Sequence, residues 1–224
     1  MVNSRGISIE SDRQGNFTSY GQVAVTGDNS TAIHVGGATT GNVDILGSVS
    51  AKGENAQGVV IEGDVTGRAN IQGSVTATGY RYNSRPGNTP TTNPNPKGIY
   101  LEKLDEDDLL QGGPAVSIAA NLSQGLLLDT GPSYGSGGIE GDDDKDGIKN
   151  GDEDDDGDGT KNRDDTDRDG DGLTDANEGR ANLVSYGAAP ALQIGSSSRD
   201  ITLGAAGTGD NAYGLINRGQ ISAF

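Results

Sequence analysis

The chain has 224 residues, of which 31% are hydrophobic and 4% aromatic, and it contains 38 glycines. This composition does not favour an ordinary globular core of bulky side chains, but it suits a thin, repetitive fold. The formal net charge of −17, with no basic patch to offset it, makes the chain a poor candidate for nucleic-acid binding, and the absence of cysteine excludes zinc fingers, disulfide scaffolds and thiol nucleophiles.

A 26-residue repeat fills the first part of the chain. Residues 21–27 (GQVAVTG) align with 47–53 (GSVSAKG) and with 73–79 (GSVTATG), each time at an offset of 26. Between these segments Asn29 falls on Asn55, and apolar positions such as Ile33 and Val59 coincide. The repeat predicts identical structural units stacked on one another.

Each unit contains three short stretches in which apolar and polar residues alternate, at 23–25, 33–35 and 43–45 in the first unit. Alternation with a period of two indicates strands with one buried face, and the intervening Gly, Asn and Asp supply turns. Three strands in a unit too small for a core of its own predict an all-β fold, a parallel β-helix or solenoid with three short strands per ~26-residue coil.

Similar segments return after two interruptions. Residues 114–118 (PAVSI) and 190–194 (PALQI) resemble 31–35, residues 209–216 resemble 53–60, and 219–223 resembles the unit start at 47. We therefore expect β-helix coils over 1–79 and a coil with a lead-in over 114–139. A proline-rich loop with one short helix, near 101–111, is expected as an insertion over 80–113. An acidic insertion covers 140–180, and coils over 181–224 are expected to continue beyond the C-terminus.

The negative charge is concentrated in the acidic insertion. Between 140 and 179 there are 18 acidic and 5 basic residues, so this window carries −13 and leaves about −4 for the rest. Residues 142–153 match the calcium-loop pattern D-x-D-x-D-G-x5-E throughout, with aspartates at positions 1, 3 and 5 and glycine at position 6. The predicted ligands of this first loop, the Ile148 one being its backbone carbonyl, are Asp142, Asp144, Asp146, Ile148, Asn150 and Glu153.

Two further loops follow almost without a gap. The second supplies Asp154, Asp156, Asp158, Thr160, Asn162 and Asp165, and the third supplies Asp167, Asp169, Asp171, Leu173, Asp175 and Glu178. This spacing leaves no room for the helices of an EF-hand. Back-to-back loops of this kind resemble thrombospondin type 3 repeats, with D-G-hydrophobic-x-D/N at 146–150 and 171–175, while Thr160 departs from that signature. The resemblance implies that calcium ions act as the core of the segment and that neighbouring loops share ligands.

The alternative for this segment is a solvated acidic linker, which would not need glycine at position 6 or aspartates at positions 1, 3 and 5. Three Ca²⁺ would cancel six of the 13 excess charges, and without metal the segment should repel itself. Folding of the insertion is therefore expected to depend on calcium. Extracellular calcium modules often bind at about 10⁻⁴–10⁻³ M, which implies a calcium-rich compartment.

Outside the acidic insertion, segments such as 47–61, 109–118 and 213–223 look like passenger segments of Gram-negative autotransporters. This resemblance implies a right-handed β-helix exported to the cell surface or beyond. Anchoring in the outer membrane is implied only through a C-terminal barrel, which this sequence does not include.

These patterns favour a non-enzymatic structural or adhesive surface protein, with a surface carbohydrate or protein as its ligand. A self-assembling filament, joined through the solenoid ends, is one alternative. A polysaccharide-acting enzyme is another, since such enzymes also use β-helices, acids and Ca²⁺. The single histidine, His34, aligns with Val60 and is expected at an exposed strand position, where it would not act as a base.

Overall fold

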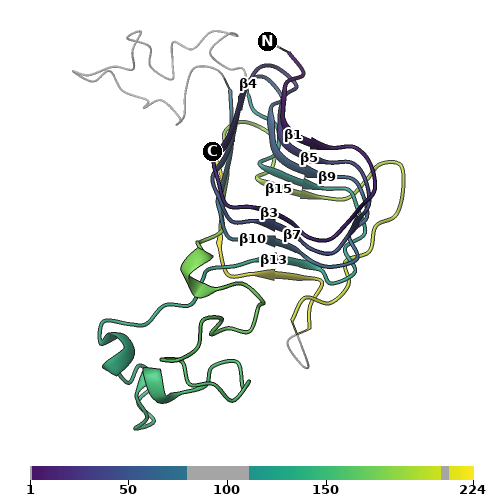
Figure 1. Cartoon of the computed structure of the whole chain (residues 1–224). Helices are drawn as coiled ribbons and strands as arrows, with labels where there is room; N and C mark the ends of the chain where they lie inside the picture. Colours follow the sequence, from purple (N-terminus) through teal and green to yellow (C-terminus); the bar gives the residue numbers. More distant parts are fainter. Residues whose placement is uncertain (1, 80–110, 208–211) are drawn as a thin grey trace, which may run out of the picture.

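The computed structural model describes residues 2–79, 111–207 and 212–224. The proline-rich insertion over 80–113, with its predicted helix, lies almost entirely outside the described residues. Parallel sheets dominate the rest, and the strands stack in layers (Figure 1). An all-β, parallel fold is therefore confirmed. Within the described residues, no helix is long and apolar enough to cross a membrane.

Three five-stranded sheets form what we call the three-sheet body. The first sheet contains β1 (Arg5–Ile9), β5 (Thr31–Val35), β9 (Gln57–Ile61), β12 (Val116–Ile118) and β15 (Leu192–Ile194). The second contains β3 (Phe17–Ser19), β7 (Val43–Ile45), β10 (Ala69–Ile71), β13 (Leu126–Leu128) and β16 (Leu215–Asn217). The third contains β4 (Val23–Thr26), β8 (Val49–Lys52), β11 (Ser74–Thr78), β14 (Asn182–Ser185) and β17 (Gln220–Ala223).

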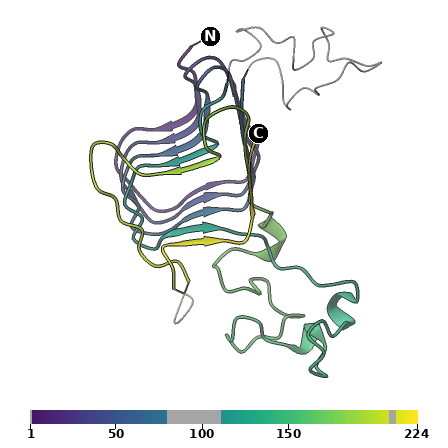
Figure 2. The same cartoon turned by 180° about the vertical axis from the view of Figure 1, so that it is seen from behind.

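The chain visits the first, second and third sheets in the same order five times, and we call each passage a circuit. A small fourth sheet pairs β2 (Arg13–Gln14) with β6 (Thr39–Thr40). Figures 1 and 2 show from opposite sides that successive circuits lie on top of one another.

The register of the sheets reproduces the sequence repeat. Val23 pairs with Val49, which pairs with Val75, so in the first three circuits each step between neighbouring strands is one 26-residue unit. At the turn between the third and first sheets, Asn29 and Asn55 both have positive φ, 51° and 55°, and the Asn55 Nδ2 to Asn29 Oδ1 distance is 3.5 Å. The predicted alignment of these units is confirmed.

Small and branched apolar side chains fill the interior in stacked columns. Ile45, Ile71 and Leu128 occupy equivalent positions of three consecutive circuits, and each is at most 1% exposed. Because apolar side chains of similar size stack through several circuits, the body forms a continuous core without tryptophan and with only two phenylalanines. Glycines are required where turns stack, since a Cβ added to Gly47 would lie 2.0 Å from the carbonyl oxygen of Gly21.

Two sequence expectations about the body are wrong, one about residues 209–216 and one about His34. Residues 209–216 resemble 53–60, but Leu215 pairs with Leu126 in the second sheet instead of joining the column of Val59 in the first. The reason is that β15 already fills the first-sheet place of that circuit. The segment 219–223 does follow the unit start, because Ile221 pairs with Leu183 in the third sheet.

His34 pairs with Val60 as expected, but it is only 6% exposed. Two carboxylates cover the ring: Glu10 lies 3.0 Å from Nδ1 and Glu62 lies 2.9 Å from Nε2. The side chains of neighbouring circuits therefore bury an outward-facing residue, which the alternating pattern of one strand does not reveal.

The acidic insertion joins β13 to β14 within the fourth circuit and extends away from the stacked sheets (Figures 1 and 2). Its two ends are held together by the Thr130–Arg180 bridge, which is antiparallel, and by the hydrogen bond from Gly131 N to Gly179 O of 2.8 Å. The segment between β13 and β14 contains three short 3-10 helices, Gly138–Glu140, Asn150–Asp152 and Asp175–Asn177.

Candidate metal centre

The three acidic loops repeat one pattern of hydrogen bonds. The first aspartate accepts the N–H of the glycine at position 6: Gly147 to Asp142 at 3.1 Å, Gly159 to Asp154 at 3.0 Å and Gly172 to Asp167 at 2.9 Å. The aspartate at position 3 accepts the N–H of the aspartate at position 5, at 3.0–3.3 Å in all three loops. The sequence periodicity is therefore a structural periodicity.

The glycine at position 6 makes this turn with a left-handed backbone. Gly147, Gly159 and Gly172 have φ of 95°, 96° and 86°, a region that side chains with a Cβ rarely adopt. In the first two loops this sharp turn folds the three aspartates back toward one another, and in the third it brings Asp169 and Asp171 together. The sequence requirement for glycine at this place therefore has a direct conformational cause.

In the first two loops the aspartates at positions 1, 3 and 5 converge as predicted. One carboxylate oxygen from each of Asp142, Asp144 and Asp146 lies within 4.8 Å of the others, and the same holds for Asp154, Asp156 and Asp158. Both groups are exposed to solvent. Three hard oxygen ligands at such spacing are suited to a hard cation such as Ca²⁺.

The third loop is different. Asp169 and Asp171 converge within 4.8 Å on Asp129, which follows β13 on the three-sheet body, and Asp167 is not in this group. Burial and the neighbouring Asp171 and Asp129 carboxylates raise the pKa of Asp169 to about 6. The sequence analysis missed Asp129, because a single acid after an apolar strand carries no spacing signal.

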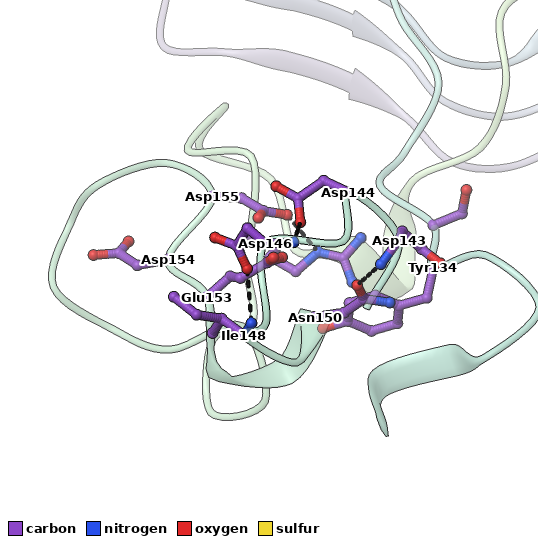
Figure 3. Close-up of a pocket in the computed structure, with 11 residues that line it drawn as sticks. Tyr134, Asp143, Asp144, Asp146, Ile148, Asn150, Glu153, Asp154 and Asp155 are labelled. Atoms are coloured by element: carbon purple, nitrogen blue, oxygen red, sulfur yellow. Dashed lines mark hydrogen bonds and ion pairs between the residues drawn. The ribbon is translucent and has the colours of Figure 1, made fainter. Parts of the chain in front are cut away.

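The acids predicted at position 12 have three different surroundings. Burial, followed by the carboxylates of Asp144 and other acids, raises the pKa of Glu153, which lines a hollow together with Asp144 and Asp146 (Figure 3). Burial, followed by Asp169 and Asp171, raises the pKa of Glu178 to about 8. Asp165 instead accepts the N–H of Asp167 at 2.9 Å, which connects the second loop to the third.

The residues at position 9 form the internal framework of the insertion. Asn150 and Asn162 are only 3% and 4% exposed, and their Oδ1 atoms accept the N–H groups of Asp143 and Asp155 at 2.9 and 3.1 Å. Their Nδ2 atoms donate to carbonyls twelve residues earlier, Gly138 O at 2.8 Å and Asn150 O at 2.7 Å. Figure 3 shows the contact between Asn150 and Asp143.

Asp175 repeats the first of these contacts by accepting the N–H of Arg168 at 2.9 Å. The residues at position 7 donate their own N–H groups to the preceding aspartate, at 2.7 Å for Ile148, 2.6 Å for Thr160 and 2.7 Å for Leu173. The metal-ligand roles of positions 7 and 9 stay predictions.

A buried arginine, whose role the sequence patterns did not indicate, lies among the loops. Arg168 is 5% exposed, its guanidinium lies 3.8 Å from the ring centroid of Tyr134, and its Nε is 3.6 Å from Asp155 Oδ2. A positive charge stacked on an aromatic face inside an acidic segment lowers the repulsion between the second and third loops. No signal in the sequence distinguishes Arg168 from the exposed bases of the segment.

Comparison of the chain with protein-family models, with curated proteins and with solved structures finds no significant match.

Proposed function

We propose that this protein is a parallel β-helix whose acidic insertion binds about three calcium ions, and that it serves as a non-enzymatic structural or adhesive component outside the cell or on its surface. The observation that carries the proposal is the hydrogen-bond pattern repeated in all three loops, which in the first two turns the aspartates at positions 1, 3 and 5 toward one point.

The solenoid part of the proposal is supported by topology. A chain that visits three parallel sheets in a fixed order, with a 26-residue step between stacked strands in the first three circuits, is what a β-helix requires. Right-handed winding agrees with the resemblance to autotransporter passengers and with the strong general preference for right-handed parallel crossovers.

The choice of calcium is supported by ligand chemistry. The converging groups are carboxylates throughout, and the segment has no histidine or cysteine to favour a softer metal. Calcium accepts six to eight oxygens in flexible geometry, whereas magnesium demands an octahedron and retains water. The first and third loops, each with a glutamate at position 12 besides its aspartates, suit the many oxygen ligands of calcium better than the octahedron of magnesium.

A structural role is supported by the surroundings of the single histidine of the body. His34 lies between Glu10 and Glu62 and is nearly inaccessible, so it is poorly placed to act as a general base on a polysaccharide. A rigid stack that displays a calcium-ordered insertion suits contact with a surface carbohydrate or protein. Weak calcium sites of this type suit an extracellular compartment, where calcium is abundant.

Calcium titration by calorimetry tests the proposal. We expect about three ions for the wild type, and the loss of one ion in Asp144→Asn and in Asp156→Asn. Asp164→Asn is the matched control, because it removes the same charge from an exposed acid outside the converging groups. Calcium binding that is absent in the wild type, or equally reduced in the control, would refute the proposal.

A further inference from the structure

Asp129 occupies an unusual place for an acid in the three-sheet body. It follows Leu128, the last residue of β13, and the register of the second sheet places it between Gln72 of the previous circuit and Arg218 of the next. Its exposed fraction is 0%. Arg218 Nη1 lies 3.0 Å from Asp129 Oδ2, but this arginine side chain is itself 57% exposed. This buried carboxylate is thus paired with a base that faces water, and its Oδ1 also accepts the backbone N–H of Thr130 at 2.8 Å.

The acidic insertion returns to this point of the body. Asp169 and Asp171 of the third loop lie within 4.8 Å of Asp129, across about 40 residues of sequence. Asp171 also contacts the previous circuit, since the Arg68 guanidinium pairs with its carboxylate at 3.2 Å. The third loop therefore rests on the second sheet.

Two buried amides of the body point to a missing ligand at this cluster. Asn70 and Gln72 are 0% exposed, and their Nδ2 and Nε2 atoms reach Asp171 Oδ2 at 3.4 and 3.1 Å. Their oxygens, Asn70 Oδ1 and Gln72 Oε1, have no hydrogen-bond partner among the described residues. A fully buried amide oxygen without a donor is costly, and a cation would satisfy it.

The net negative charge of the cluster can be balanced by one divalent ion. Glu178 interacts electrostatically with Asp129, Asp169 and Asp171, and its two carboxylate oxygens are buried without a hydrogen-bond partner among the described residues. Against these four acids stand two guanidinium groups, Arg68 and Arg218. When all four carboxyl groups are ionised, two negative charges remain, and the buried Asp44 beside Arg68 and Asp171 adds to them in a place where water cannot screen them well.

We propose that Asp129 of the three-sheet body, with Asp169 and Asp171 of the third loop, forms a composite cation site in which the ion fastens the acidic insertion to the second sheet. This inference rests on the proposed function, because it concerns one of the three calcium ions. Glu178 and the amide oxygens of Asn70 and Gln72 supply the additional ligand atoms for the ion. The first two ions order the insertion internally, and the third sets its position on the body.

The composite site has a consequence for stability. An ion that binds ligands on both parts connects order in the insertion to the unfolding of the body, because ligand binding to the folded state alone stabilises it. The first two sites, made only from the insertion, lack this connection. Calcium should therefore raise the midpoint of thermal unfolding of the body mainly through the third site.

Calcium titration and thermal unfolding of Asp129→Asn test the proposal. We expect two ions in place of three, and a calcium-induced rise in the unfolding midpoint less than half that of the wild type. The matched control is Asp64→Asn, which also breaks an aspartate–arginine pair on the body, since Asp64 lies 2.7 Å from Arg199. This control should bind three ions and keep the full rise.

A second variant keeps the test decisive if Asp129→Asn does not fold. Arg218→Gln removes an exposed positive charge from the Asp129 carboxylate, so calcium at the third site should bind about fivefold tighter or more, with the other two affinities unchanged. An unaltered third affinity in this variant overturns the composite site, as does a folded Asp129→Asn that binds three ions as the wild type does.

The failures of the two proposals are distinguishable. A wild type that binds no calcium refutes the proposed function. A wild type that binds two ions, one lost in Asp144→Asn and the other in Asp156→Asn, overturns the composite site and leaves the calcium-binding function standing.

Discussion

Replacing Asn162 by alanine should weaken calcium binding strongly, although the side chain lies inside the insertion. Its Nδ2 donates to Asn150 O at 2.7 Å and its Oδ1 accepts the N–H of Asp155 at 3.1 Å. Asn162 is 4% exposed, so alanine leaves both backbone partners without a hydrogen bond in a poorly hydrated place. Each lost bond with a stranded partner costs about 1–1.5 kcal/mol, so the total is about 2–3 kcal/mol.

This loss appears in the calcium affinity if calcium orders the loops. At about 1.4 kcal/mol per factor of ten, calcium should bind the second loop about 30- to 150-fold more weakly. Because Asn162 also holds the carbonyl of Asn150, the first loop should weaken as well, and amide hydrogen exchange should increase in both loops. Asn177→Ala is the control: it removes an exposed asparagine whose Nδ2 donates to Thr174 Oγ1, three residues earlier.

Calorimetric titration and hydrogen exchange of the two variants separate a structural role from a ligand role for Asn162. A change confined to the second loop would show that Asn162 acts as a ligand alone. An affinity and exchange pattern equal to those of the control would refute the structural reasoning altogether.

Three other predictions concern the body and the pH dependence. Gly47→Ala should lower the midpoint of thermal unfolding clearly, because its Cβ would lie 2.0 Å from Gly21 O, whereas Gly21→Ala, with nothing within 4 Å, should change it little. Ile71→Ala, at a 1% exposed core position, should cost about 2–5 kcal/mol in denaturant unfolding, and an effect below about 1 kcal/mol would contradict the stacked core. In the absence of calcium, the raised pKa of Glu178, about 8 against 4.5, and of Asp169, about 6 against 3.8, mean that the folded state favours their protonated forms. The docked insertion should therefore lose stability as pH rises from about 4 to 8, which hydrogen exchange at 169–178 would measure. The Glu178→Gln variant should lack the part of this loss that occurs above about pH 6. A stability of the insertion that rises with pH would contradict this reasoning.

The repeat and the first two loops could be predicted from sequence because their determinants are local. Alternating Val and Ile place a strand, glycine or asparagine places the turn, and a fixed 26-residue step brings Val23, Val49 and Val75 into register. In the loops, aspartates two residues apart and a glycine at position 6 determine the turn by themselves.

The remaining features depend on contacts between distant parts of the chain. Asp129 meets Asp171 only because the insertion folds back on the second sheet, and no periodicity connects the two residues. Likewise, the spacing pattern marks Asn162 as a candidate ligand, but only the packing of one loop on the previous one shows that its side chain is buried. The sheet of Leu215 depends on which place of the circuit is already filled.

The central claim is that divalent cations give the acidic insertion its form. Anomalous diffraction from crystals grown in millimolar calcium tests it most directly. The account predicts three peaks, each at about 2.3–2.6 Å from carboxylate oxygens, with the third touching Asp129 as well as Asp169 and Asp171. Well-ordered loops without peaks at these carboxylates, or a segment from 142 to 178 without density in the presence of calcium, would contradict it.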